Sequence, residues 1–379
     1  MKTKGRLQKQ TGNKAKTTTL MSRSCLLGFL ALAITSFGKG ATPPVRIDET
    51  SQTSAPSQLE RYEDSHQAMG TEFRVAVYGR DQNYLAETVE QVWEEIDRID
   101  QQMSNYKPES ELSQINRLAA SQDVLVSPDL FALLQTSIHY SEETGGAFDI
   151  TVGPLMKAWG FFRGQGRVPS AAELHEVLKH VGYQHVKLDP ARRTIHFDVP
   201  GIELDLGGIA KGYAVERAVR VLRDNGITSA FVSSGMSSIY ALGAPPGEKG
   251  WKITLRDPFD ENKAADVVYL KNLAMSTSGN YNKFFKLGGK MYSHIMDPHT
   301  GMPVEGMLAT TVFVAGGTDS DALSKLYVLG VEGSRRYLAK HPDIEALFYV
   351  PTGVEGQFRR VALKSTSFHL PPDALVEVQ

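Results

Sequence analysis

Apolar residues recur from about residue 62 onward at spacings typical of interleaved strands and helices. The segment Phe73–Gly79 is rich in β-branched and aromatic residues and predicts a strand. Residues 84–103 place apolar side chains three or four positions apart, which predicts an amphipathic helix. Further strands are expected at His185–Leu188, Thr194–Val199, Ile202–Leu206, Ala230–Ser234, Ile239–Leu242, Lys252–Arg256, Val267–Leu270, Thr310–Ala315 and Ala346–Val350.

Helix boundaries are indicated by capping residues and glycines. Ser127-Pro128 opens a helix that runs to Gly145-Gly146, and Ser170 with Glu173 forms a capping box. Two more helices are expected, one from Gly207-Gly208 to Asn225-Gly226 and one over residues 318–330. Because many neighbouring strands are joined too closely for crossover helices, the pattern predicts one α+β domain, whether or not it is built from tandem halves.

The amino-terminal region has the layout of a secretory signal. Lys2–Arg23 is basic, Cys25–Phe37 is apolar, and small residues follow, which predicts a signal peptide over residues 1–41. About 13 apolar residues are fewer than the roughly 20 that span a bilayer, although a retained short anchor stays open as an alternative. Residues 42–61 are expected to be a flexible linker, and residues 62–379 the main domain. The protein is therefore expected to be exported to the periplasm or cell envelope.

Composition narrows the classes of function. The 379-residue chain is 41% hydrophobic and 22% charged, which is ordinary globular usage. Its single cysteine, Cys25, excludes an intrachain disulfide, a cysteine-rich zinc site and an iron–sulfur cluster. The net charge of −2 combines a basic start with about −10 on residues 41–379, which argues against binding to nucleic acid. No dinucleotide fingerprint, P-loop, HExxH or GxSxG motif is present.

The segment Glu203–Lys211 carries the first chemical signal. Gly207-Gly208 stands between a predicted strand and a helix, where free N–H groups and the helix dipole favour an anion such as phosphate. Asp205 is expected on the strand face near that turn, and Lys211 in the first helical turn. The alternative is a plain strand–helix turn with Asp205 as a cap.

The segment Thr144–Leu155 places Phe148 beside Asp149 just after a predicted helix end. An aromatic ring next to a carboxylate suits a flat heteroaromatic ligand. A Schellman-type helix end explains the two glycines equally well.

Two loops, Ser276–Asn280 and Tyr292–Gly301, are expected to bring Ser, Thr, His and Asp side chains together. His294 and Asp297 suit phosphate chemistry or proton transfer, and a turn with a structural histidine is the alternative. In the helix that follows residue 318, Asp319 and Asp321 suit a hard cation such as Mg²⁺, although carboxylates at a helix start also need no function.

Seven segments in this order resemble one family, the ApbE-type FAD:protein FMN transferases, formerly called thiamine biosynthesis lipoproteins. The resemblance covers roughly Ala68 to Tyr349. Its segments are MGTEFRV, MSNYKPESELSQIN, TGGAFDITVGPL, LDLGGIAKGYAVE, STSGNYNKFF, SHIMDPHTG and DALSKLYVLG. It implies a single α+β, T-fold-like domain of mixed sheets and helices. It also implies cleavage of FAD at the pyrophosphate, attachment of FMN through a phosphodiester to a Thr of an acceptor protein, release of AMP, and a need for Mg²⁺.

The resemblance also implies roles for individual residues. His294 and Asp297 match a loop close to the reacting phosphates, with His294 as the candidate for proton transfer. Gly208, through its backbone carbonyl, and Asp321 match metal ligands, and Lys325 stands at a third metal-ligand position. The FAD-contacting positions correspond to Met69, Tyr106, Ala147, Phe148, Asp149, Asp205, Lys211 and Ser278.

Two positions depart from the family pattern. Lys325 stands where the family has a metal-binding Thr, and Met236 stands where it commonly has Gly. We expect Lys325 to pair with Asp321, four residues earlier on one helix, to weaken Mg²⁺ binding and to replace part of its charge. The expected function is flavin transfer to an exported or membrane acceptor, such as a subunit of an electron-transfer complex. The alternatives are an FAD-binding protein with weak or lost catalysis and an FAD pyrophosphatase.

Overall fold

The computed structural model describes residues 59–378 apart from 165, 236 and 365–374. The predicted signal peptide, nearly all of the predicted linker and Met236 therefore lie outside the described residues. Strand β1 (Glu60–Ala68) begins two residues before the predicted start of the domain at Tyr62. The described residues belong to one compact unit, as an α+β domain requires.

The described part of the chain contains helices of very different length. The longest is α1 (Gln82–Met103), whose first turn is capped by the side chain of Asp81. The other α-helices are α2 (Glu111–Leu118), α3 (Pro128–Glu143), α4 (Gly153–Ala158), α5 (Ala171–Leu178), α6 (Ala210–Asp224), α7 (Gly317–Leu323) and α8 (Leu326–Leu338). Two short 3₁₀ helices are η1 (Phe161–Arg163) and η2 (Tyr183–His185).

An eight-stranded sheet, antiparallel throughout, is the centre of the fold, with the order β1-β2-β6-β7-β10-β13-β14-β15. Its further strands are β2 (Thr71–Gly79), β6 (Ala230–Ser234), β7 (Ser238–Leu242), β10 (Leu273–Gly279), β13 (Ala309–Val314), β14 (Glu345–Pro351) and β15 (Phe358–Lys364). Smaller sheets are built from β3 (Val124–Leu125), β5 (Thr194–Phe197) and β4 (Val186–Asp189), from β16 (Leu375–Val378), β9 (Ala264–Lys271) and β8 (Trp251–Arg256), and from β11 (Phe284–Leu287) and β12 (Lys290–Ser293).

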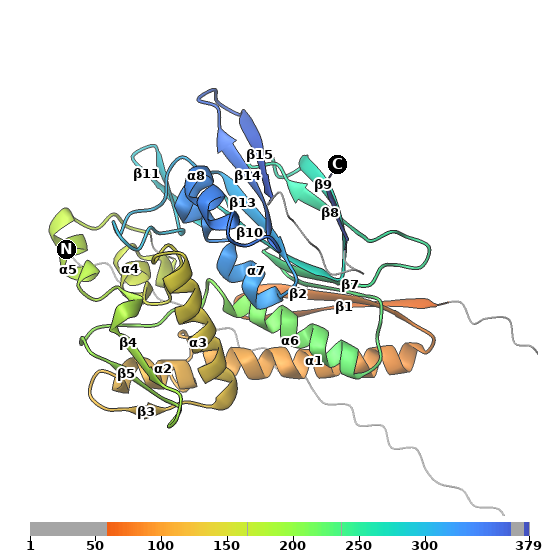
Figure 1. Ribbon diagram of the computed structural model, residues 1–379, viewed down its shortest axis with the longest axis horizontal. Coiled ribbons are helices and arrows are strands. Elements are labelled where there is room, and N and C mark those ends of the chain that lie inside the picture. Colours follow the sequence, from red (N-terminus) through yellow and green to blue (C-terminus); the bar gives the residue numbers. More distant parts are fainter. Residues whose placement is uncertain (1–58, 165, 236, 365–374, 379) are drawn as a thin grey trace, which may run out of the picture. The chain divides into compact units, whose positions relative to one another are not determined.

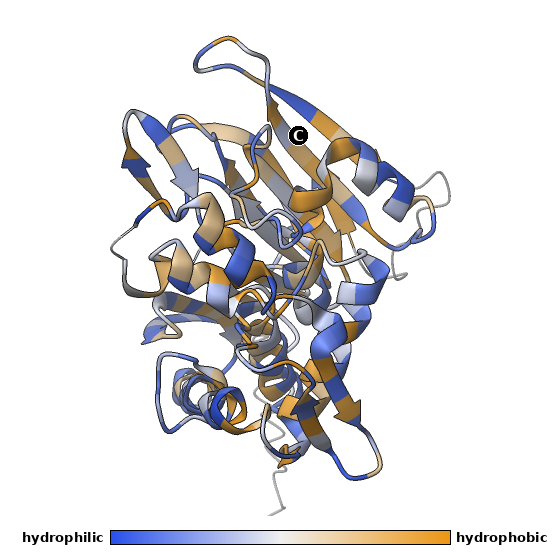
Figure 2. Ribbon diagram, turned by 90° about the vertical axis from the view of Figure 1, so that its left-hand side faces the viewer, coloured by the Kyte–Doolittle hydropathy of each residue, from blue (hydrophilic) through white to orange (hydrophobic). Residues whose placement is uncertain are grey.

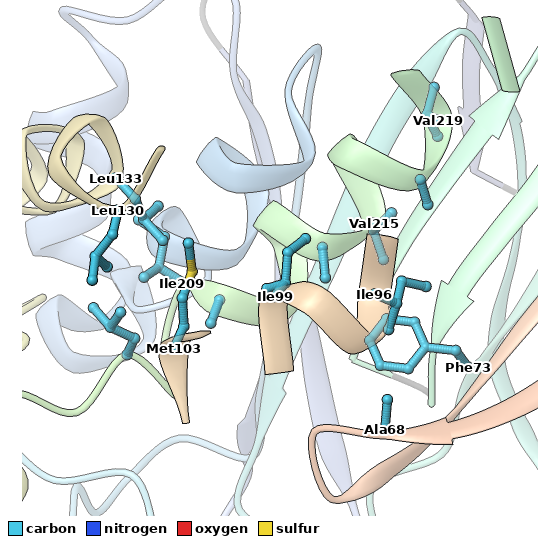
Figure 3. Packing of buried hydrophobic residues seen from close by; sticks show 14 of the residues in the cluster. Ala68, Phe73, Ile96, Ile99, Met103, Leu130, Leu133, Ile209, Val215 and Val219 are labelled. Atoms are coloured by element: carbon cyan, nitrogen blue, oxygen red, sulfur yellow. The ribbon is translucent and has the colours of Figure 1, made fainter. Parts of the chain in front are cut away.

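Helices α1 and α6 lie side by side along the large sheet, and α7 lies between α6 and β10 (Figure 1). Hydrophobic residues gather on the inner strands of this sheet, whereas the outlying loops are hydrophilic (Figure 2). The main core joins β2, α1, α6 and α3 (Figure 3). Its members include Phe73, Ile96, Ile99, Met103, Leu130, Leu133, Ile209, Val215 and Val219. Among the described residues, no helix is long and apolar enough to span a membrane.

Most predicted elements are confirmed, including Pro128 at the start of α3 and the Ser170 cap of α5, which accepts a hydrogen bond from the Glu173 N–H at 3.2 Å. The strand predicted at Ile202–Leu206 is wrong, because this segment is irregular. Its backbone groups form hydrogen bonds with partners that do not belong to a strand. The Asn116 side chain donates to the carbonyl of Leu204 at 3.0 Å and accepts from its N–H at 2.7 Å.

Two further expectations are corrected. Ser276–Gly279 belongs to the buried strand β10 and is not a loop. The helix predicted over residues 318–330 is two helices, because α7 ends at Leu323 and α8 begins at Leu326. Gly330 does not end α8. Gly330 lies inside α8, where its φ of 65° marks a kink.

Candidate active site

The Gly207-Gly208 turn before α6 is held in place by hydrogen bonds of Asp205. The N–H of Asp205 donates to the Ile150 carbonyl at 2.7 Å, and Oδ1 of Asp205 accepts from the Gly207 N–H at 2.8 Å. Asp205 therefore folds the turn, as in the capping alternative, and does not lie on a strand face. The Lys211 ammonium reaches back and donates to the Gly207 carbonyl at 2.8 Å.

The start of α6 offers less to an anion than the sequence suggests. Internal acceptors engage the N–H groups of Gly207, Ile209, Ala210 and Gly212. Positive charge for an anion at this turn therefore has to come largely from side chains. Lysine ammonium groups are suited to that role because they present compact charge to phosphate.

Three lysines, Lys211, Lys283 and Lys325, all influence His294 electrostatically. The Lys283 carbonyl accepts from Nδ1 of His294 at 3.0 Å, which assigns the ring proton to Nδ1 and leaves a lone pair on Nε2. Burial, together with these ammonium groups, lowers the pKa of His294 to about 4. The imidazole is therefore neutral at pH 7 and able to accept a proton at Nε2.

A pocket of about 270 Å³ is lined partly by Lys283, so it borders this group of cations. Its walls include Phe161 and Phe285, and the ring of Phe161 lies 6.4 Å from that of His294. Aromatic walls beside a cluster of cations suit a ligand that joins a flat ring to phosphate.

Lys325 and Asp321 form a buried ion pair at the break between α7 and α8. The Lys325 Nζ lies 3.5 Å from Oδ1 of Asp321 and donates to the backbone carbonyls of Asp321 at 3.1 Å and Gly208 at 3.2 Å. The predicted pairing is confirmed, although not on one helix, because Lys325 precedes α8. Burial acts to raise the pKa of Asp321, but the Lys211 and Lys325 ammonium groups hold it below its ordinary value.

Helices α6 and α7 meet at a glycine contact that positions Asp321. A Cβ on Gly212 would lie 2.2 Å from the Gly317 carbonyl oxygen and 2.5 Å from the Asp321 Cβ. The close approach lets the Gly212 N–H donate to Oδ2 of Asp321 at 2.9 Å. Any larger residue at Gly212 would separate the two helices and break this bond.

A buried hydroxyl of β10, that of Ser278, supports the Lys325 ammonium indirectly through Ser324. Ser324 Oγ donates to the Asp321 carbonyl at 2.7 Å, so Ser278 must donate to Ser324 in their 2.8 Å contact. Lys325 donates to the same Ser324 oxygen at 2.9 Å. Ser278 therefore acts here through Ser324. Its predicted role as an FAD contact is not visible in these bonds.

Asp297 directs both carboxylate oxygens into its own turn. Oδ1 accepts from the backbone N–H of His299 and Oδ2 from the Thr300 hydroxyl, each at 3.0 Å. Nε2 of His299 lies 2.9 Å from the carbonyl of Gly145, which ties this turn to the segment that carries Phe148. Asp297 is thus a positioning residue in this arrangement, and His294 holds the base-like nitrogen.

Asp149 likewise organises a loop. It accepts from the N–H and hydroxyl of Thr151 at 2.7 and 2.6 Å and from the N–H of Tyr183 at 2.8 Å. Ala147 and Phe148 are buried, and a Cβ on Gly208 would lie 3.4 Å from the Phe148 ring. Gly146 donates to the Ser141 carbonyl, as the predicted Schellman end requires.

Among the described residues, no hydrogen bond joins the predicted FAD contacts Tyr106 and Met69 to the lysine cluster. Tyr106 is 58% exposed and stacks on Phe162 with ring centroids 4.5 Å apart. Met69 occupies the β1–β2 turn with a φ of 51°, which is uncommon for a residue with a side chain. Backbone strain of this kind occurs preferentially at ligand sites.

Some members of the site were not singled out from the sequence. Lys283, Ser324 and His299 all lie inside recognised segments, next to residues that were chosen. Lys283 follows the STSGN run, and His299 comes two residues after Asp297. Their position within those segments is the signal that was available.

The residues assigned to Mg²⁺ do not fit that ion. Magnesium takes about six oxygen ligands at about 2.0–2.1 Å. The Gly208 carbonyl and the Asp321 carboxylate already face the Lys325 ammonium. Within the described ranges, no group of three or more His, Cys, Asp or Glu side chains is arranged to hold a metal ion.

Comparison with known proteins finds relatives in sequence and in structure. A model of the ApbE family matches residues 69–348. The FAD:protein FMN transferase of Treponema pallidum is 32% identical over 312 residues, which cover 78% of this chain and 86% of that protein. The enzyme of that name from Escherichia coli K12 is 31% identical, covering 72% and 79%. The crystal structure of the ApbE protein from Thermotoga maritima superposes with a TM-score of 0.73 at 32% identity, covering 82% of this chain and 98% of that one. For the flavin transferase ApbE from Vibrio cholerae the TM-score is 0.71 at 28% identity, with the same coverage.

Proposed function

The chain belongs to the ApbE family, and on that premise we propose that it is an FAD:protein FMN transferase. The observation that carries the proposal is the set of lysines at the Gly207-Gly208 turn and at His294. Lys211 and Lys325 donate to the carbonyls of Gly207 and Gly208, and the Lys283 carbonyl accepts from Nδ1 of the neutral His294 imidazole. Such a group binds a pyrophosphate through its cations and supplies one uncharged base beside it.

The transfer balances as a displacement at phosphorus. The hydroxyl oxygen of an acceptor Thr forms a bond to the FMN phosphorus while the bond from that phosphorus to the bridging oxygen breaks. The electron pair leaves with AMP, and the hydroxyl proton passes to Nε2 of His294. A positioned base of this type contributes about 10²–10⁴-fold to the rate.

The remaining residues of the site orient the substrate. The aromatic pocket beside Lys283 would receive a flat ring system of FAD, and the Gly207-Gly208 turn, which packs on the buried Phe148 ring, would lie against the pyrophosphate. The Asp297 turn holds the His294 segment against the Gly145 loop through His299. Because the residues assigned to Mg²⁺ do not fit that ion, the lysines are the groups that would neutralise the phosphate charge.

The amino-terminal sequence supports a compartment for the protein and a class of acceptor. A basic stretch, an apolar run of about 13 residues and small residues are typical of a signal peptide. We therefore place the protein in the periplasm or cell envelope. Its acceptor would then be a Thr-bearing protein outside the cytoplasm, such as a flavin-carrying subunit of a membrane electron-transfer complex.

Intact-mass spectrometry tests the proposal. The protein is incubated with FAD and a flavin-acceptor domain, and separately with the same domain carrying Thr→Val at its flavinylation site. We expect the first domain alone to gain the mass of FMN less water, with an equal amount of AMP released. Free FMN and AMP without a mass gain would replace the proposal with FAD pyrophosphatase activity. Bound FAD without AMP would replace it with flavin binding.

A further inference from the structure

The Lys325 ammonium lies between the Gly208 carbonyl and the Asp321 carboxylate, the two groups to which the resemblance assigns a metal ion. Its Nζ lies 3.2 Å from the Gly208 carbonyl oxygen and 3.5 Å from Oδ1 of Asp321. It also donates to the Asp321 carbonyl and to Ser324 Oγ. Four oxygen atoms from three residues therefore surround one nitrogen.

The neighbours of this nitrogen identify its protonation state. Carbonyl and carboxylate oxygens only accept hydrogen bonds, and the Ser324 proton is already used on the Asp321 carbonyl. Nζ is therefore surrounded by acceptors, and an ammonium, with three hydrogens, suits them better than a neutral amine with two. A positive nitrogen also matches the Asp321 carboxylate, whose side chain is only 4% exposed.

The surroundings hold the ammonium in one place. A Cβ on Gly208 would lie 3.3 Å from Cε of Lys325, so the stem packs against a bare backbone. Ser278 of β10 supports Ser324 from the sheet, and Gly212 of α6 fixes the other oxygen of Asp321. The side chain nevertheless keeps 20% of its surface exposed, and its charge acts on His294 together with those of Lys211 and Lys283.

We propose that Lys325 is the resident cation of this site, so that the chain binds the pyrophosphate of FAD without a divalent metal. The identity of the ligand rests on the proposed function. A divalent ion cannot share the Gly208 carbonyl and Asp321 with the ammonium, because the two cations repel each other at these distances. Lys325 supplies one positive charge where a divalent ion would supply two. Lys211, a second lysine of the cluster, partly makes up the difference.

Equilibrium FAD binding, followed by flavin fluorescence, tests this in EDTA and in excess Mg²⁺. The variants are Lys325→Thr, which removes the ammonium and adds a hydroxyl, and Lys340→Thr, which removes an exposed lysine outside the site. Wild type and Lys340→Thr are expected to bind FAD equally in both buffers. Lys325→Thr is expected to bind about tenfold more weakly in EDTA and to recover in Mg²⁺, as two coupled sites do.

An affinity of wild type that rises about tenfold with Mg²⁺ would overturn the inference, because that is the coupling expected of an unfilled metal site. Should Lys325→Thr not fold, the wild-type comparison remains decisive, and Lys325→Arg must keep metal-independent binding. Acceptor labelling separates the two proposals. Metal-independent FAD binding without labelling in either buffer removes the transferase and keeps the inference. Labelling in Mg²⁺, together with FAD binding that is lost in EDTA, does the reverse.

Discussion

Helix α6 is packed between two regions of opposite character. Toward α1 and β2 its buried neighbours are mostly apolar, with Val215 near Ile96, Ile99 and Phe73 (Figure 3). One ion pair, Arg217 with Glu95, also joins α6 to α1. Toward α7 its Gly212 meets Asp321, and behind α7 the sheet presents hydroxyl groups. Serines of β10 bond to serines of α7 and its end in the pairs Ser276–Ser320 and Ser278–Ser324.

The polar region continues across the sheet. Ser276 is opposite Ser238 of β7, which is opposite Ser234 of β6, and Ser278 is opposite Thr310 of β13. All of these residues are buried. Apolar side chains would fill the same space with less cost, since a buried hydroxyl needs a partner. We infer that the apolar region stabilises the domain, while Ser278 and Ser324 of the polar region hold Lys325 in place.

The largest effect is expected from breaking the ion pair of the polar region. Asp321→Asn leaves the Lys325 ammonium without its carboxylate and should lower the free energy of unfolding by about 3–5 kcal/mol. Urea denaturation measures the loss. The double variant Asp321→Leu with Lys325→Met removes both charges and should recover most of it. Equal losses in the single and double variants would show that the pair does not couple.

A smaller effect separates two kinds of buried hydroxyl. Ser324→Ala removes an acceptor of the ammonium and should cost about 1–3 kcal/mol of unfolding free energy. Ser238 is the matched control, because its hydroxyl has no hydrogen-bond partner within the described residues. Ser238→Ala should leave stability unchanged or raise it. Similar losses in both variants would mean that the hydroxyls act only as space-fillers.

In the apolar region, trimming one methyl group should act on stability alone. Ile96 is fully buried, and Ile96→Val should cost about 0.5–1.5 kcal/mol through the small cavity that it leaves. Under conditions in which the variant is fully folded, its dissociation constant for FAD should equal that of wild type. A change in FAD affinity would contradict the division of labour between the two regions.

The same division explains which parts of the fold were predictable. The periodicity of α1 and the apolar strand β6 identify those elements, because their burial is hydrophobic. Strand β10 was missed because Ser276, Thr277 and Ser278 resemble a polar loop, although they are covered by α7. The segment Ile202–Leu206 was taken for a strand because its apolar alternation is strand-like, but an asparagine side chain far along the chain satisfies its backbone.

The site was predictable as a set of segments rather than as a geometry. Gly208 and Lys325 lie 117 positions apart, so no local spacing reveals that the ammonium of one meets the carbonyl of the other. The resemblance to a family supplied the pairing of Gly208 with Asp321, and it marked Lys325 as a departure. Only the packing of α7 against α6 shows that the lysine reaches that same carbonyl.

The smallest effect at neutral pH concerns His294, whose charge state depends on burial and on Lys211, Lys283 and Lys325. Its pKa in the folded chain is about 4, against about 6.5 when unfolded, so the unfolded state binds more protons between these values. Stability should therefore fall as the pH drops from about 6.5 toward 4. His294→Gln removes this contribution, so its urea midpoint should fall less on acidification than that of wild type, while at pH 7 only the bond to the Lys283 carbonyl is altered. His175→Gln, at an exposed position of α5, is the matched control and should follow wild type. Parallel profiles for wild type and His294→Gln would mean that the imidazole is not held neutral by burial and the three lysines, and the polar region would then lose its candidate base.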